Sequence, residues 1–338
     1  MRAMAFSYLQ FEPLLLSLLT SKTESEAVAV AARLASLFEG LLLKSVPNRA
    51  YTSTRPTRVN GGVALSSQHA LDCLKDPLRT VRFIKGVHAA ILDALARFPG
   101  ERINLLYAGC GPAAALIVPL LPAFAPQQLS VTLLDVNGTS VTSVLALLKT
   151  LRASAYINSV QLGDAATFQF EKSKKLHIVL TETMDKGLTK EPQLRIVQNL
   201  APQLAKNGIL LPESIHVYTE HSFYGKEPYF DIYKNVSRIG PAYPSENTKL
   251  LFTIDRNVQC QPVFHFESGP IDVPVFFEET PDVCIFAEVV IYGKLKLEKS
   301  KSLLSNPVCV ASLYNLKCRS YTLVYTATGI PNWALREI

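Results

Sequence analysis

The middle of the chain alternates short apolar runs with longer amphipathic stretches. The apolar runs end near a glycine or an acid and are typical of buried strands. They are INLLYAG (103–109), LSVTLLDV (129–136), INSVQLGDA (157–165) and KLHIVLTE (175–182). Helical patterns follow in 113–124, 139–154 and 191–208, and Pro119 is expected to kink the first of these helices. Strands that alternate with helices favour βαβ units and a parallel sheet that is covered on both faces.

The N-terminal part of the chain predicts helices. Thr23 and Glu26 form a capping-box pattern, and apolar residues then recur at helical spacing up to Gly40, where the helix could end. The segment 45–62 is rich in Pro, Ser, Thr and Gly, which predicts a surface loop. A second helical block is expected over 66–98.

After about Pro212 the pattern changes to short aromatic and β-branched runs, such as VPVFFEE and SYTLVYTAT, without helical stretches between them. Such runs are typical of antiparallel β structure. The predicted architecture is therefore α/β, with a helical arm and loop (1–62), a Rossmann-like domain with a parallel sheet (63–212) and a C-terminal antiparallel β domain (213–338).

Composition and charge narrow the partners. The chain has 338 residues, of which 48% are apolar and 18% charged, so it can bury a sizeable core. The net charge of +6 is not concentrated in a long run of like charges, and we expect no nucleic-acid partner. The apolar run LLLSLL (14–19) is too short to span a membrane and is preceded by Glu12, so we expect a cytoplasmic protein without a membrane partner.

The six cysteines are widely scattered, and neither a CxxC motif nor a Cys/His cluster with zinc-ligand spacing occurs. We therefore expect reduced thiols and no metal site. The cysteines are Cys73, Cys110, Cys260, Cys284, Cys309 and Cys318.

A glycine turn follows the first apolar run. Gly109 and Gly111 lie between a strand and an expected helix, where glycine allows a tight turn and close approach of the backbone to a ligand. Asp135 ends the next strand, where a carboxylate can accept both hydroxyls of a ribose. Asp164 ends the third strand, where an acid either forms a turn or reaches an adenine amino group. Two cofactors fit this layout, a dinucleotide through a loose GxGxxG/A pattern and S-adenosylmethionine.

The segment TETMDKGLTKE (181–191) directly follows the last apolar run. It places Glu182 and Glu191 around Gly187. Strand ends rarely need two glutamates on either side of a glycine, so this pair is a candidate for holding a ligand.

Three segments together resemble the protein arginine methyltransferases, a family of the class I S-adenosylmethionine-dependent fold. The segment CLKDPLRTVRFIKGVHAAI (73–91) is similar to the family's helix before the glycine turn, and the glycine turn with Asp135 is similar as well. The third segment is the double-glutamate loop, which matches at Glu182, Met184, Leu188 and Glu191. With NGILLPESIHVY, which is similar to the segment that follows in the family, the resemblance covers roughly 73–218.

The resemblance implies S-adenosylmethionine as cofactor and methyl transfer to a guanidino nitrogen. Arg79 would pair with the methionyl carboxylate through its planar fork, and Asp76 would orient the site. Glu182 and Glu191 would accept the N–H groups of the acceptor from both sides, and either could take up the proton afterwards. The sulfonium is already activated, so no metal is needed. Further cofactor contacts would come from Gly109, Cys110, Gly111, Asp135 and Asp164, and substrate contacts from Met184 and Tyr51.

Several residues depart from the family pattern, mostly on the substrate side. Tyr107 stands in place of the usual acid, and Ala113 in place of a third glycine. In the loop, Thr183 replaces an aromatic residue and Asp185 a glycine. No Thr-His-Trp occurs in the β domain, where the single Trp follows GIPN and His265 is expected in a strand. We therefore expect a changed, small acceptor, free arginine or a related guanidino compound, with an arginine-containing peptide as the alternative.

Other functions stay open. One is methyl transfer to another small-molecule amine or hydroxyl, and a second is a cofactor-binding module without turnover. A third is a nicotinamide-dependent dehydrogenase, which leaves Arg79, Glu182 and Glu191 without a role. Finally, EHSFYGKEPYFDIYKNV (220–236) predicts either an internal lid or the arm through which similar family members pair, so a homodimer is expected.

Overall fold

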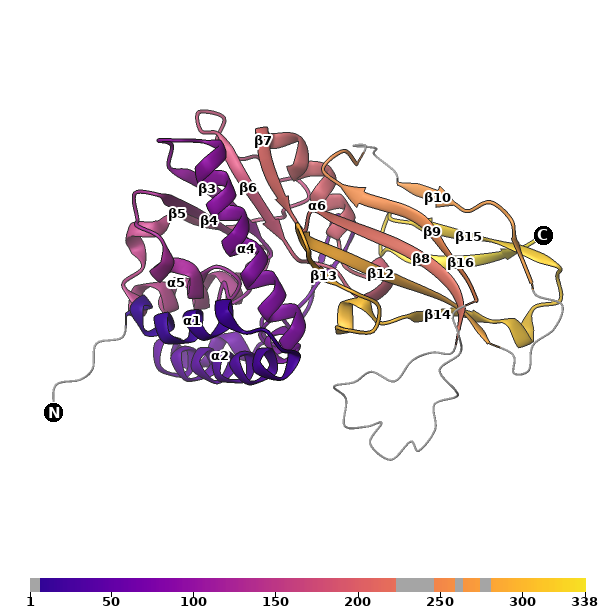
Figure 1. Cartoon of the computed structure of the whole chain (residues 1–338), viewed down its shortest axis with the longest axis horizontal. Coiled ribbons are helices and arrows are strands. Elements are labelled where there is room, and N and C mark those ends of the chain that lie inside the picture. The colour runs from indigo at the N-terminus through magenta and orange to yellow at the C-terminus, as the bar shows by residue number, and fades with distance from the viewer. Residues whose placement is uncertain (1–6, 223–245, 259–263, 274–280) are drawn as a thin grey trace.

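The alternating middle of the chain forms a five-stranded parallel sheet in the order β5, β4, β3, β6, β7 (Figure 1). The computed structural model describes residues 7–222, 246–258, 264–273 and 281–338. The strands are β3 (Ile103–Ala108), β4 (Leu129–Asp135), β5 (Ile157–Leu162), β6 (Leu176–Thr181) and β7 (Leu204–Leu211). Every residue of β4 and β6 is buried, as expected for strands covered on both faces. The strand order reverses between β3 and β6, and ligands of such sheets bind at the carboxyl ends of the strands beside that point.

The helices of the same region pack against this sheet. Helix α4 (Pro77–Arg97) contacts β3, β6 and β7, whereas α5 (Gly138–Leu151) contacts β4 and β5, and α6 (Gln193–Leu200) contacts β6. The N–H of Arg79 donates to the Asp76 carboxylate at 3.2 Å, which caps the start of α4. Arg79 therefore lies in the first turn of this helix.

The N-terminal helices are α1 (Glu12–Thr20) and α2 (Glu24–Ser45), and α2 contacts both α4 and α5. The predicted capping box of Thr23 and Glu26 is present. Helix α2 does not end at Gly40, because Leu41 and Leu42 are buried in its last turns. That burial outweighs the cost of one glycine in a helix, which is about 1 kcal/mol.

The segment 45–62, which we expected to be loop, contains regular structure. Strands β1 (Thr57–Val59) and β2 (Gly62–Ala64) form an antiparallel hairpin, and helix α3 (Ser67–Asp72) follows. The two-residue turn is Asn60–Gly61, with φ of +84° at Gly61, a sequence that tolerates the positive φ of tight hairpins.

No α-helix follows the glycine turn, contrary to the prediction for 113–124. Successive turns and a 3-10 segment, Val118–Ala123, take its place. Pro112, Pro119 and Pro122 explain the difference, because proline lacks the N–H that a helix interior requires and clashes with the preceding turn. The free N–H groups of an α-helix N-terminus therefore do not contribute to ligand binding at this turn.

The C-terminal part folds into antiparallel sheets, as predicted. In one sheet the strands follow the order β13, β12, β8, β9, with β14 also paired to β12. In the other the order is β10, β15, β11, with β16 paired to β15. Their bounds are β8 (Ser214–Ser222), β9 (Glu246–Asp255), β10 (His265–Glu267), β11 (Ile271–Asp272), β12 (Asp282–Tyr292), β13 (Leu295–Leu297), β14 (Val308–Ser312), β15 (Ser320–Thr326) and β16 (Asn332–Glu337). His265 lies at the start of β10, as predicted, and its side chain is exposed.

The two sheet systems form two lobes that lie end to end, with α4 close to β12 and β13 at their junction (Figure 1). Short 3-10 segments connect many of the elements. They are Tyr8–Phe11, Pro47–Thr52, Cys73–Lys75, Val118–Ala123, Ser154–Tyr156, Lys186–Leu188, Ala201–Gln203, Leu303–Ser305 and Leu313–Asn315.

The sequence predicted a dimerisation arm and no membrane partner. The dimerisation arm expected over 220–236 lies outside the described residues from 223 onward, so the homodimer stays a prediction. Within the described part of the chain, no helix has the length and apolar character needed to cross a bilayer.

Candidate active site

A cavity lies at the carboxyl edge of the parallel sheet, between the glycine turn, the double-glutamate loop and the hairpin 57–64. The candidate residues that line it are Arg79, Gly109, Cys110, Gly111, Asp135, Asp164, Glu182, Met184 and Glu191. Tyr51 is buried but does not line the cavity. Its 3-10 segment is kinked at Asn48 and Arg49, both with positive φ, and packs against α3 and α5 instead.

Gly109 is required at the turn for two reasons. Its φ of +74° lies in the left-handed region, and an added Cβ would lie 2.3 Å from Cγ2 of Thr183. The N–H of Gly109 donates to the carbonyl of Leu134 at 2.9 Å, and the N–H of Gly111 donates to Oδ2 of Asp135 at 2.8 Å. The turn therefore ties β3 to β4 and packs directly against the start of the double-glutamate loop.

The two strand-end aspartates both accept backbone N–H groups. Asp135 accepts two such bonds at 2.8 Å, one from Asn137, and burial raises its pKa to about 6. Asp164 accepts from Asn60 at 3.1 Å and from Ala166 at 2.8 Å. Asp164 thus forms its turn and holds the hairpin beside the cavity, whereas the remaining lone pairs of Asp135 can accept hydroxyl donors.

The hairpin β1–β2 forms one wall of the cavity. The N–H of Val63 donates to the carbonyl of Lys190 at 2.8 Å. An added Cβ on Gly62 would lie only 2.5 Å from the same carbonyl oxygen, so a side chain at this position would force the hairpin and the loop apart. The hairpin was not predicted, although the Asn-Gly dipeptide at 60–61, within the segment VNGGV (59–63), is a strong hairpin signal.

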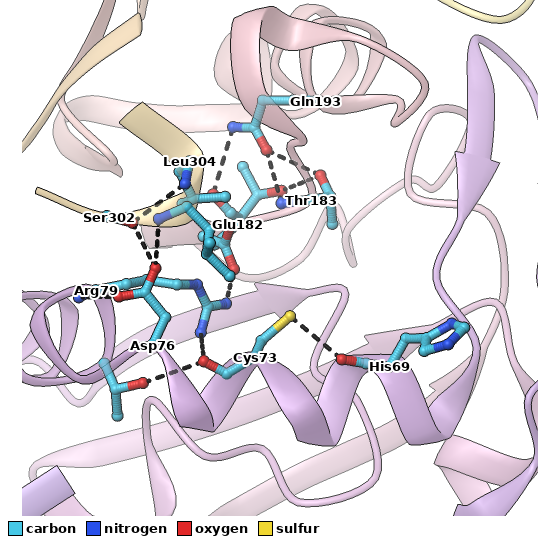
Figure 2. Close-up of polar contacts among 12 residues, drawn as sticks. His69, Cys73, Asp76, Arg79, Glu182, Thr183, Gln193, Ser302 and Leu304 are labelled. Atoms are coloured by element: carbon cyan, nitrogen blue, oxygen red, sulfur yellow. Dashed lines mark hydrogen bonds and ion pairs between the residues drawn. The ribbon is translucent and has the colours of Figure 1, made fainter. Parts of the chain in front are cut away.

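Arg79 belongs to a buried polar cluster (Figure 2). Its Nη2 forms an ion pair with Oε2 of Glu182, and the two side chains are only 8% and 5% exposed. Its Nη1 donates to the carbonyl of Cys73 at 3.3 Å. Within the described part of the chain, its buried Nε has no hydrogen-bond partner. The guanidinium therefore keeps one unsatisfied donor for a further acceptor.

Asp76 connects this cluster to the C-terminal lobe (Figure 2). Its Oδ1 caps α4, while its Oδ2 accepts from the hydroxyl of Ser302 at 2.7 Å and from the N–H of Leu303 at 2.8 Å. Asp76 is fully buried but does not line the cavity. It therefore fixes the position of Arg79 without reaching a ligand itself.

Glu191 lines the same cavity from the other end of the loop. It is 9% exposed, and the described residues make neither a hydrogen bond nor an ion pair to its carboxylate. Burial, reinforced by the nearby charge of Asp185, raises its pKa to about 8, although Arg79 and Lys190 act in the opposite direction. A carboxyl group with this pKa is mostly neutral at pH 7 and ionises when a cation binds beside it.

The loop between the two glutamates has a strained backbone. Gly187, Leu188 and Lys190 have φ of +60°, +57° and +61°. Such values cost roughly 1 kcal/mol or more at each non-glycine residue, so neighbouring structure must hold them. Part of that hold is the bond from the N–H of Lys190 to the carbonyl of Pro331 at 3.0 Å.

Two aromatic residues of the C-terminal lobe also hold this loop. The indole N–H of Trp333 donates to the carbonyl of Gly187 at 2.8 Å, and the hydroxyl of Tyr325 donates to the carbonyl of Leu188 at 2.9 Å. Both side chains are buried. Sequence reasoning noted the single Trp without a function for it, because its partner lies far away in the sequence.

Gln193 holds the start of the loop (Figure 2). Its Oε1 accepts from both the N–H and the hydroxyl of Thr183 at 2.9 Å, and its Nε2 donates to the carbonyl of Thr181 at 3.4 Å. These bonds fix the strand end that carries Glu182. A glutamine in an amphipathic helix has no distinctive sequence signal, so the sequence did not reveal it.

The lining of the cavity suits a ligand with a carboxylate at one end and hydroxyls further along. Arg79 supplies the cationic fork and Asp135 the acceptor, and apolar side chains such as Leu71, Leu116 and Ile196 line the walls. Among the residues that the structure describes, no group of three or more His, Cys, Asp or Glu side chains is arranged to hold a metal ion.

The comparisons with known proteins concern the fold. No family model matches the sequence, and no curated protein matches it. The Arabidopsis thaliana protein arginine methyltransferase 10, solved in a uniquely open conformation, is similar in structure with a TM-score of 0.51 at 11% identity, over 80% of this chain and 96% of that chain. The Trypanosoma brucei PRMT1 enzyme–prozyme heterotetrameric complex with AdoHcy gives a TM-score of 0.47 at 14% identity, over 79% of this chain and 97% of that chain. The chain thus has an arginine-methyltransferase-like fold, with a Rossmann-like sheet and a C-terminal β lobe.

Proposed function

We propose that the protein is an S-adenosylmethionine-dependent N-methyltransferase that acts on a guanidino nitrogen of arginine or of a small arginine-related metabolite. The observation that carries this proposal is that Glu182 and Glu191, from the two ends of one loop, line a single cavity together with Arg79. Two carboxylates suit a planar cation that has several N–H donors. The resemblance of the loop and the likeness of the fold to a protein arginine methyltransferase support the same reaction class.

The cofactor would be held by residues at the carboxyl edge of the sheet. The unsatisfied Nε of Arg79 suits the cofactor carboxylate, and Asp135 suits the ribose hydroxyls. When bound, S-adenosylmethionine supplies a methyl group that is already activated on a sulfonium. The protein must therefore provide mainly position and electrostatics.

The glutamates would orient the acceptor and receive its proton. By accepting N–H bonds they favour positive charge on the nitrogens that do not react, which leaves a lone pair on the nitrogen that does. That nitrogen forms the new N–C bond as the S–C bond breaks, and S-adenosylhomocysteine leaves as a neutral thioether. The methylated nitrogen then loses one proton, and Glu191, with a pKa of about 8, is suited to take it.

A small acceptor is favoured by the close packing of the hairpin on the end of the loop that carries Glu191. The hairpin packs on the end of the loop, where an added Cβ on Gly62 would lie 2.5 Å from the carbonyl oxygen of Lys190 and 2.9 Å from the carbonyl carbon of Glu191. A free amino acid needs less room there than a peptide chain. The departures from the family pattern at Thr183 and Asp185 fall on the same side of the site.

Transfer of a labelled methyl group to a panel of acceptors tests this function. The panel would contain L-arginine, other small guanidino compounds, arginine-rich peptides and simple amines. We expect label in L-arginine or another small guanidino compound. Label in peptides alone would contradict the small acceptor, and label only in amines would contradict the guanidino group. Cofactor binding without any transfer would instead support the inactive binding module.

A further inference from the structure

We infer that Arg79 is a positioning residue for the acceptor as well as a ligand of the cofactor. It holds Glu182 in an internal ion pair and releases this glutamate when a ligand carboxylate takes its place. The acceptor then binds only after the cofactor. This inference rests on the proposed function.

In the structure, Arg79 holds the Glu182 carboxylate in an ion pair. The pair between Nη2 and Oε2 is almost completely shielded from water, with exposed fractions of 8% and 5%. Water screens such a pair much less than it screens a pair at the surface, so the partners separate only when another charge replaces one of them. A third nitrogen of the guanidinium, Nε, has no partner among the described residues, and Arg79 lines the cavity in which a ligand carboxylate would lie.

The internal pair competes with the acceptor for the same carboxylate. Arg79 carries a guanidinium, which is the group that the acceptor would present to Glu182. While Arg79 occupies Glu182, the second glutamate of the loop, Glu191, is mostly neutral at pH 7 because its pKa is about 8. Neither glutamate of the loop then offers a free negative charge to a cation.

A ligand carboxylate on Arg79 changes this balance. Bidentate binding to a carboxylate suits the fork, including the unsatisfied Nε, better than the single contact with Glu182 does. Glu182 is then free to accept the N–H groups of the acceptor. The same competition must weaken cofactor binding in return, because linkage between two sites is reciprocal.

This reciprocity gives a test that needs no acceptor. Calorimetry would measure the binding of S-adenosylhomocysteine and of 5′-methylthioadenosine, which has the adenosine and the sulfur but no amino-acid group. Glu182→Gln removes the competing charge, so S-adenosylhomocysteine should bind at least about fivefold more tightly, as expected for a hydrogen bond to a charged group. The affinity for 5′-methylthioadenosine should not change.

Control variants make the result specific. Glu191→Gln should leave both affinities unchanged at pH 7, since Glu191 makes no ion pair with Arg79. Glu182→Asp keeps the charge but shortens the reach to Arg79, so it should also bind S-adenosylhomocysteine more tightly than the wild type does. This variant replaces Glu182→Gln if the latter does not fold. Unchanged or weaker binding of S-adenosylhomocysteine by both variants would overturn the inference and leave the proposed function standing. Failure of the wild type to bind either adenosyl compound would overturn both.

Discussion

Glu182 and Glu191 belong to one loop and line one cavity, yet their surroundings differ. Glu182 is paired with Arg79, whereas Glu191 is buried without a hydrogen-bonding partner among the described residues. For Glu191, burial raises the pKa to about 8, so its protonation changes near neutral pH. The same type of side chain therefore has two states in this site. Glu182 is held in an ion pair, whereas Glu191 titrates near neutral pH.

The pH dependence of methyl transfer should report on Glu191. The guanidinium of an acceptor does not titrate in this range, so its binding to the enzyme with bound cofactor follows the carboxylate form of Glu191. With a pKa of about 8, kcat/KM for the acceptor should rise about tenfold between pH 7 and pH 9. Initial rates at limiting acceptor would measure this rise. A flat profile, or the same rise in Glu191→Gln, would show that another group titrates.

The same residue should lower stability at high pH. Its pKa is about 8 in the folded protein against an ordinary value of 4.5, so folding is penalised increasingly as pH rises through this window and most above pH 8. Glu191→Gln removes the penalty and should raise the melting temperature at pH 9 by at least about 2–4 °C, because one pKa unit corresponds to 1.36 kcal/mol. At pH 5 the variant and the wild type should melt at similar temperatures. Glu171→Gln, at an exposed glutamate, is the matched control, and an equal shift there would contradict the explanation.

At the scale of elements, the double-glutamate loop depends on strands that follow it by more than a hundred residues. Strands β15 and β16 bring Tyr325 and Trp333 to the carbonyl groups of Leu188 and Gly187. These bonds hold the positive φ values that place the two glutamates on one cavity. The C-terminal lobe thus contributes to the proposed acceptor site through the backbone of the loop.

Trp333→Phe and Tyr325→Phe each remove one donor and keep an aromatic ring. A lost hydrogen bond of about 1 kcal/mol corresponds to about a fivefold change in an equilibrium constant. We therefore expect faster hydrogen exchange over 187–190 and a KM for the acceptor that rises several-fold, with cofactor affinity unchanged. Hydrogen-exchange mass spectrometry and steady-state kinetics would measure the two effects.

The control for this pair is Tyr321→Phe, which removes a buried hydroxyl that bonds Nε2 of His221 at 2.7 Å and does not bond the loop. This variant should leave both the exchange of the loop and the KM unchanged. If the Trp333 and Tyr325 variants behave like this control, the two bonds do not position the loop.

The sequence predicts the elements of this fold better than the contacts within its site. The buried strands are visible because each is a short apolar run, and the loop is visible because its spacing matches a known motif. The helix expected after the glycine turn does not form because Pro119 and Pro122 interrupt it. The pair of Arg79 with Glu182 was not predicted, since both side chains suit a ligand as well as they suit each other. Such choices depend on distances that no local pattern contains.

At the scale of the whole molecule, one of the contacts that join the two lobes is made by the buried carboxylate of Asp76. Asp76 caps α4 and accepts from Ser302 and Leu303 of the C-terminal lobe. The arrangement couples the position of Arg79 to the packing of the lobes. That the chain also pairs with a second copy of itself stays a prediction.

Replacement of Asp76 by Ala should therefore destabilise both the helix start and the junction. Loss of a cap costs about 1 kcal/mol, and unsatisfied buried donors cost about 1–3 kcal/mol in addition. We expect a melting temperature several degrees below that of the wild type and weaker binding of S-adenosylhomocysteine. Asp72→Ala, which removes a surface pair with Lys75 and a 3.3 Å hydrogen bond from Gln68, is the control and should melt within about 1 °C of the wild type. Equal melting temperatures for the two variants would contradict this role of Asp76.

The central claim is that the two glutamates clamp a guanidino acceptor, and one measurement tests it most directly. Methyl transfer from labelled S-adenosylmethionine to the best guanidino acceptor would be compared in the wild type, Glu182→Gln and Glu191→Gln, with cofactor affinity measured in parallel. We predict that both variants lose turnover by about a hundredfold or more, as for the loss of a group that stabilises the transition state, while cofactor affinity is kept or increased. Variants that remain active, or a wild type that methylates no guanidino compound, would contradict the account.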